Sequence, residues 1–241
     1  MTSRIAQRWP TLRVTLSAHL PFIAVLWVLF TVVALVIAGV VGMTNGMPDS
    51  VVHDAATQAP RWLLFGLGLD LVGTYLRLQL AHGRTRREFL GQAVAHAVLI
   101  SGFAAVLVTL CYLAERALYA ILDWPQTLDR TGLFTAADQY PVIFGAYWLA
   151  LLLWTAAGVL IGLGFFRSSG AGVLTIPLGL VVVLPSIVVV GNSGLPFLGD
   201  ELAGVGLSTA AVLGASAGLF VLAVGLAWAM VRDVPMKTKA P

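Results

Sequence analysis

Charged residues are scarce in this chain of 241 residues, and long stretches contain none. Asp, Glu, Lys and Arg make up 10% of the sequence, whereas hydrophobic residues make up 59%. Five stretches lack any charged residue: 20–43, 90–114, 141–166, 171–190 and 206–231. A helix needs about 20 apolar residues to cross the bilayer, so each stretch is long enough for one span. The composition therefore excludes an ordinary soluble domain.

A sixth span is predicted over 61–80, where Asp70 and Arg77 interrupt an otherwise apolar stretch. The six spans and their short connections fill most of the chain. We therefore expect an all-α, polytopic membrane protein that forms a single transmembrane domain over residues 1–241.

Cysteine is almost absent as well, because Cys111 is the only one, and this excludes an internal disulfide. His19, His53 and His82 are placed at membrane boundaries or in loops, and the histidines do not have the spacing of a zinc or haem site. The chain has no glycine-rich nucleotide-binding loop, no nucleophile elbow and no zinc-protease motif. We therefore predict a non-catalytic protein that has no cofactor or metal of its own.

The positions of the charges predict the orientation of the spans. An even number of spans puts both termini on one side, and all Lys and Arg residues fall on that side except Arg61, Arg116 and Arg130. Most acidic residues fall on the opposite side. Because Lys and Arg collect in cytoplasmic loops, we expect both termini in the cytoplasm. The net charge of +3 then reflects membrane topology rather than binding to nucleic acid.

The segment 1–19, before the first span, has the pattern of an amphipathic helix. Its apolar residues recur at helical spacing, with Arg4, Arg8 and Arg13 among them. Pro10 suits the first turn of a helix. We predict an N-terminal interfacial helix that contacts membrane lipid, with a basic topology anchor of no fixed structure as the alternative.

A basic corner lies between the second and third spans, with the sequence Gly83-Arg84-Thr85-Arg86-Arg87-Glu88-Phe89. Gly83 can adopt the left-handed conformation that ends a helix. Thr85 and Glu88 have the spacing of a capping box, which begins the next helix. We therefore predict a sharp, charged and structured corner that suits a protein partner better than lipid alone.

Asp70 is the most unusual side chain in the predicted spans, because a charged group inside the bilayer costs about 2.5–3.5 kcal/mol. Arg77 lies two turns further along, on a similar helix face. His96 lies in the neighbouring span. These three residues are candidates for lining a translocation path, and Asp70 with His96 would resemble a proton relay. The alternative is a set of structural polar contacts between helices.

Two pairs of small residues, Gly158/Gly162 and Gly214/Gly218, have the four-residue spacing that lets helices approach closely. Packing within one chain explains this spacing as well as dimerisation does.

The spans, the basic lead-in segment and the corner 83–89 together resemble the membrane-spanning permease subunit of bacterial ABC transporters, specifically the ABC-2 type exporters. The resemblance implies that the corner docks into a separate ATP-hydrolysing subunit, with residues Gly83 to Phe89 as the coupling element. It also implies a second permease chain, identical or related, and a location in the bacterial inner membrane. Pro10–His19 would match the family's interfacial connecting helix.

One departure from that family concerns the outer loops. Many of these exporters have a long re-entrant element between spans five and six, whereas the connection 191–206 is short here. This departure favours a small or amphiphilic substrate over a polysaccharide.

Two other functions stay open. A proton-coupled secondary transporter would use Asp70, and His96 with it, as proton carriers. A membrane assembly or immunity protein without transport would not need the structured corner.

Overall fold

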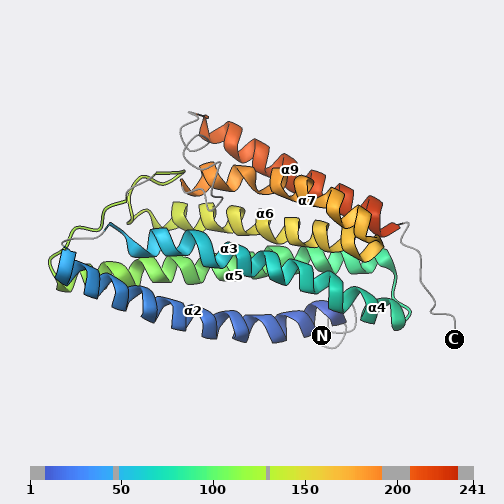
Figure 1. Cartoon of the computed structure of the whole chain (residues 1–241), viewed down its shortest axis with the longest axis horizontal. Coiled ribbons are helices and arrows are strands. Elements are labelled where there is room, and N and C mark those ends of the chain that lie inside the picture. The colour runs from blue at the N-terminus through green and yellow to red at the C-terminus, as the bar shows by residue number, and fades with distance from the viewer. Residues whose placement is uncertain (1–8, 46–48, 129–130, 192–206, 233–241) are drawn as a thin grey trace, which may run out of the picture.

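The computed structural model describes residues 9–45, 49–128, 131–191 and 207–232, and the regular structure in these ranges is helical (Figure 1). Six of its helical segments are long and apolar enough to cross a membrane, which confirms the predicted all-α, multi-pass fold. The elements are α2 (Pro10–Asn45), α3 (Val51–Asp70), η1 (Leu71–Leu76), α4 (Arg77–Ala81), α5 (Arg86–Ile121), α6 (Tyr140–Arg167), α7 (Ser169–Val190) and α9 (Thr209–Arg232). One membrane segment is formed by α3, η1 and α4 together.

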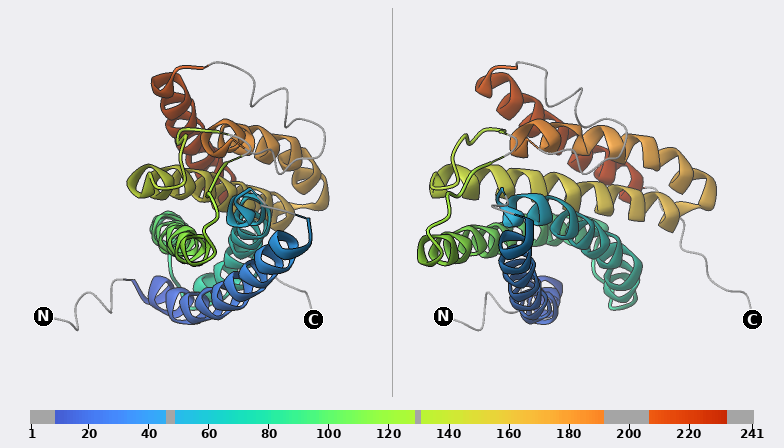
Figure 2. Two further views of the ribbon diagram at one scale, coloured as in Figure 1. Left: turned by 90° about the vertical axis from the view of Figure 1, so that its left-hand side faces the viewer. Right: turned by 60° about the vertical axis from the view of Figure 1, so that its left-hand side comes forward.

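Helix α6 lies at the centre of the bundle, while α2 and α9 lie at its opposite edges (Figure 1). Every residue of α6 from Leu153 to Gly164 is buried. A helix that is apolar on all sides packs against neighbours on all sides, and α6 contacts α3, α5, α7 and α9. Helix α2 crosses α3 and α5 obliquely (Figure 2).

The start of α2, the α4–α5 corner, the α6–α7 turn and the end of α9 all lie at one end of the bundle, at the right of Figure 1. We call it the inner end and its opposite the outer end. Helices therefore alternate in direction, as six successive spans require.

Helix α2 begins at Pro10, as predicted from the preference of proline for a first helical turn. Residues 10–19 continue into the first span without a break, and residues 1–8 lie outside the described ranges. The 36 residues of α2 reach about 54 Å, whereas the hydrocarbon core is about 30 Å thick. Helix α2 is therefore longer than one perpendicular crossing of the hydrocarbon requires.

Helix α3 extends further outward than the predicted span 61–80. It begins at Val51, after Ser50 accepts a hydrogen bond from the His53 backbone N–H (3.1 Å) as the N-cap. Arg61 therefore lies nearly three turns after the start of the helix rather than in its first turn.

Glycines bring α3 and α6 into backbone contact. A Cβ on Gly68 would collide with the Thr155 carbonyl oxygen, and a Cβ on Gly158 would collide with the Phe65 carbonyl oxygen. Gly162 lies against Val72 of η1. The pair Gly158/Gly162 thus serves packing within the chain.

The pair Gly214/Gly218 has no atom within 4 Å of a Cβ placed on either residue. Its role therefore differs from that of Gly158/Gly162, because it makes no close helix contact in the described part of the chain.

Gly158→Ala is expected to lower the free energy of unfolding by about 1–3 kcal/mol, because the added methyl group must push α3 away from α6. Gly145→Ala is the matched control, since Gly145 lies on the same helix with open space around it. Unfolding of both variants in detergent, followed by circular dichroism, measures the difference. Equal stability of the two variants would contradict the close contact.

Candidate functional site

The corner between α4 and α5 has the local structure that its sequence predicts. Gly83 has a φ of 72°, in the left-handed region. The backbone N–H of Glu88 donates to the Thr85 hydroxyl (3.2 Å), and the backbone N–H of Thr85 donates to the Glu88 carboxylate (3.0 Å). Both bonds of a capping box are therefore present. The corner has a fixed backbone shape.

The corner is also anchored to the bundle. Phe89 is completely buried in a cluster that includes Leu71 and Leu76 of the preceding segment. The Arg86 guanidinium donates to the carbonyl oxygen of Arg232 at the end of α9 (2.7 Å). A cation is favourable there because the carboxyl end of a helix carries partial negative charge. The corner thus joins α4, α5 and α9, while Arg87 stays exposed.

A second polar group, the inner cluster, lies in the inner half of the bundle and consists of Thr15, His19, Asp70 and His96. His19 Nδ1 lies 3.3 Å from His96 Nε2, and His19 Nε2 lies 3.5 Å from the Asp70 carboxylate. His96 Nδ1 lies 3.2 Å from the Thr15 hydroxyl. The two predicted residues Asp70 and His96 therefore do belong to one cluster, but His19 stands between them.

The inner cluster admits two directions of hydrogen bonding. When Thr15 donates to His96, each histidine donates onward and the chain ends at the Asp70 carboxylate. When Thr15 donates instead to the Leu12 carbonyl (3.0 Å), His96 donates to Thr15 and His19 donates to His96. His19 Nε2 then carries no hydrogen, so it can donate to the Asp70 carboxylate only if His19 takes up a second proton. The two arrangements therefore differ in whether the contact between His19 and Asp70 is satisfied without an added proton.

Asp70 is placed at a break in helical geometry. The π-helical segment η1 follows it directly, and π-helical turns are common at functional sites. The Asp70 side chain keeps 45% of its surface exposed and accepts a hydrogen bond from Thr74 (2.7 Å). Arg77 does not join this group, since its guanidinium lies 5.4 Å from the ring centre of Phe166 on α6. The wider turn of η1 rotates Arg77 away from the face that carries Asp70.

His19 is the residue that the sequence interpretation missed, because it was placed at a membrane boundary. In the structure its side chain projects from α2 and is buried against His96 of α5. Thr11, Thr15 and His19 recur every four residues, which puts them on one helix face, and this spacing is the signal that could have revealed it.

A further group of buried polar residues, the outer cluster, lies toward the outer end. Glu115 is completely buried, and its carboxylate accepts hydrogen bonds from the Ser50 hydroxyl (2.5 Å), the Val52 backbone N–H (2.9 Å) and the Gln126 amide (2.8 Å). Two of these donors belong to the start of α3. A carboxylate there is favourable because the amino end of a helix carries partial positive charge.

The outer cluster continues toward the middle of the membrane through aromatic side chains. His53 Nδ1 lies 2.8 Å from the Tyr112 hydroxyl, which lies 3.1 Å from the Tyr147 hydroxyl. Arg61 is only 2% exposed and interacts electrostatically with Tyr147. Its neighbour Trp62 packs against a tryptophan close to the middle of α6. Arg61 therefore lies near mid-depth, where an ionisable residue is a functional candidate.

An apolar layer separates the inner and outer clusters. On α5, the residues between His96 and Tyr112 include the completely buried Ile100, Ala104 and Val108. They pack with Ile23 of α2 in the largest apolar cluster. The two polar clusters are therefore not connected in this conformation.

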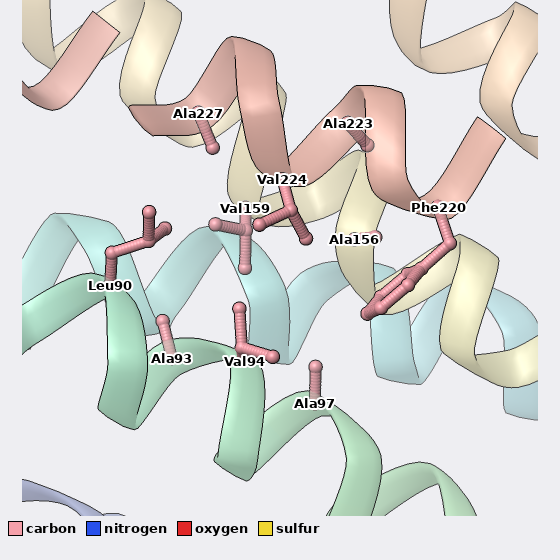
Figure 3. A pocket seen from close by; sticks show the side chains of 10 residues that line it. All are labelled: Leu90, Ala93, Val94, Ala97, Ala156, Val159, Phe220, Ala223, Val224 and Ala227. Atoms are coloured by element: carbon pink, nitrogen blue, oxygen red, sulfur yellow. The ribbon is translucent and has the colours of Figure 1, made fainter. Parts of the chain in front are cut away.

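A cleft between α5, α6 and α9 has no polar or ionisable side chain in its lining. Its lining residues are all apolar and include Leu90 of α5, Val159 of α6 and Ala223 of α9 (Figure 3). Its volume of about 20 Å³ has room for little more than one water molecule. The described residues also contain no group of three or more His, Cys, Asp and Glu side chains that could hold a metal ion.

The chain matches no family model, no curated protein and no solved structure. The corner and the two polar clusters are therefore the features of the molecule that bear on its function.

Glu115→Leu is expected to lower the free energy of unfolding by about 3 kcal/mol, because two buried donors and one partly buried donor lose their acceptor. Glu115→Gln keeps one acceptor oxygen and is expected to cost less. The exposed neighbour Arg116 provides the control, since Arg116→Gln removes only a surface ion pair with Asp138 and an exposed hydrogen bond to the Tyr140 hydroxyl. Denaturation in detergent measures all three variants. A Leu variant as stable as the Arg116 control would refute the structural role of Glu115.

Proposed function

We propose that this chain is the permease subunit of an ATP-driven ABC transporter of the ABC-2 exporter type, in the bacterial inner membrane with both termini in the cytoplasm. The corner 83–89 then docks on a separate ATPase subunit. The single observation that carries this proposal is the shape of the corner, which is basic, capped at both sides and exposed at the inner end.

The exposed arginines of the corner suit a partner that presents carboxylates. A guanidinium forms bidentate pairs with a carboxylate, which fixes both distance and angle. Arg87 is exposed, and Arg84 forms an ion pair with Glu88 of the same turn (4.0 Å). In docking of this kind, the corner would bind its partner as a rigid element.

Because the corner is anchored to the bundle, a force that acts on the corner would be transmitted to the helices. A movement of the docked corner would act on α9 through the bond from Arg86 to Arg232, and on the inner core through Phe89. The inner and outer clusters, separated by the apolar layer, provide polar surfaces on both sides of a closed path. A small or amphiphilic substrate fits such surfaces, and a second permease chain would complete the twelve-span pathway of the family that the chain resembles.

Arg87→Ala is expected to weaken ATPase binding by about 10- to 150-fold, because a charged hydrogen-bonded pair is worth about 1.5–3 kcal/mol. The matched control is Arg167→Ala, which removes an exposed arginine at the inner end but outside the corner. Co-purification in mild detergent and substrate-stimulated ATP hydrolysis are the measurements. Wild-type values of both for Arg87→Ala would leave the corner as a mere topology anchor.

A second function, proton-coupled secondary transport, is favoured by the inner cluster. In one of its two hydrogen-bond directions His19 pairs with Asp70 only after taking up a proton, and half-exposed Asp70 is the end of the chain where a proton would arrive. A proton-driven carrier would need this exchange, whereas an ATP-driven permease would need only the polar surface.

Reconstituted vesicles separate the two functions. The ABC proposal predicts that accumulation of fluorescent amphiphiles requires ATP and the partner ATPase, and that a pH gradient alone drives none. Asp70→Leu is expected to reduce this transport while insertion into the membrane stays intact, because removal of the charge makes insertion easier. Accumulation driven by a pH gradient without ATP, and lost in Asp70→Asn, would establish the proton-coupled carrier instead.

A further inference from the structure

A cavity between α2 and α3 lies outward of the inner cluster. Its volume is about 380 Å³, and its lining residues are all apolar, among them Leu26 and Phe30 of α2 and Pro60 and Leu63 of α3. Neither the docking corner nor the two polar clusters include these residues. The cavity can therefore accept the apolar part of a ligand.

An open strip leads from this cavity to Asp70. Leu63, Gly66 and Asp70 are three and four residues apart, which puts them on one face of α3. Gly66 is exposed, and a Cβ placed on it would have no atom within 4 Å. His19 and Phe30 also share one face of α2, because eleven residues make about three turns. The cavity and the strip together form the α2–α3 groove, which ends where His19 meets Asp70.

The end of the groove at Asp70 lies inside the hydrocarbon. His96 follows Arg86 of the charged corner by ten residues, or about 15 Å along α5, which is still about 11 Å of depth at a tilt of about 40°. The headgroup layer on each side is only about 5–8 Å thick. Asp70 contacts His96 through His19, so its carboxylate lies deeper than the headgroups.

The charge at this end of the groove is negative. The Asp70 side chain keeps 45% of its surface exposed. The Thr74 hydroxyl donates to it, and His19 in the first hydrogen-bond direction donates as a neutral ring, so neither supplies a positive charge. In the second direction the proton taken up by His19 supplies it. No Lys or Arg side chain within the described ranges forms an ion pair with Asp70. An exposed carboxylate at this depth favours a cation, because opposite charges attract strongly where water is scarce.

We propose that the α2–α3 groove binds a lipophilic cation, a molecule with a rod-shaped apolar body and one quaternary ammonium group. The body fills the cavity beside Phe30 and Leu63. The ammonium group lies against the Asp70 carboxylate, seven residues or about 10 Å further along α3. A neutral molecule of the same shape binds less tightly, because it leaves the carboxylate without a counter-charge.

This proposal names the substrate class of the proposed permease, and it rests on that function for the transport step alone. Binding of the cation requires only the groove of this chain. A purified chain without ATP or an ATPase therefore tests the binding separately from the docking of the corner.

Energy transfer from the seven tryptophans to a bound dye measures the binding. The probes are trimethylammonium-diphenylhexatriene and neutral diphenylhexatriene, which share one fluorophore and differ in the ammonium group. Both are titrated into the full chain in detergent at mildly alkaline pH, and the signal from dye in empty micelles is subtracted. The unaltered chain is expected to bind the cationic dye about tenfold more tightly than the neutral dye, which corresponds to about 1.4 kcal/mol.

Three variants locate the site. Asp70→Asn keeps the size of the side chain and is expected to lose the preference for the cationic dye. Gly66→Leu fills the strip and is expected to weaken binding of the cationic dye about tenfold. Gly39→Leu is the matched control, since Gly39 also has open space around it but is nine residues from Phe30 and so lies on the opposite face of α2.

Equal affinity of the unaltered chain for both dyes would overturn the proposal, because the groove would then accept any apolar chain. Full preference in Asp70→Asn would overturn it as well, and so would equal losses in Gly66→Leu and Gly39→Leu. None of these results would bear on ATPase docking at the corner. Conversely, failure of an ATPase to co-purify would leave a positive binding result in place.

Discussion

The absence of water from the bilayer core is the constraint on which the whole structure depends, because every buried polar group must find its partner inside the protein. Helices satisfy the backbone, and the side chains that remain are collected into clusters. Glu115 shows the principle, since its carboxylate is held by a serine, a backbone N–H group at the start of α3 and a glutamine. The inner cluster meets the same demand with two histidines that link α2, α3 and α5.

The inner end combines rigidity with exposure. Caps and the buried Phe89 fix the corner, and the bond from Arg86 to the end of α9 joins it to the far edge of the bundle. Asp70, η1 and Gln79 all belong to the segment that leads into this corner. A partner that shifts the corner would therefore act on the same segment that carries the inner cluster. This connection is the physical basis for proposing a coupled transport protein.

Local features of the structure could be predicted from the sequence, and contacts between distant segments could not. The apolar stretches, the start of α2 at Pro10, the left-handed Gly83 and the cap formed by Thr85 and Glu88 depend on neighbouring residues, and all are confirmed. The bridging position of His19 depends on how α2 crosses α5, which no local pattern specifies. The burial of Arg61 and Glu115 was missed because α3 begins further outward than its apolar stretch suggests. The π-helical turn that separates Arg77 from Asp70 also leaves no clear mark in the sequence.

The central claim is that the corner is a cytoplasmic docking element, and photo-crosslinking in living cells tests it most directly. A photo-reactive amino acid in place of exposed Arg87 would report what lies against the corner, and the same probe in place of Arg116 at the outer end would be the control. The account predicts that the probe at residue 87 captures an ATP-binding cassette subunit, identified by mass spectrometry, and that the probe at residue 116 does not. Crosslinks from residue 87 to lipid alone, or to no ATPase in repeated experiments, would contradict it.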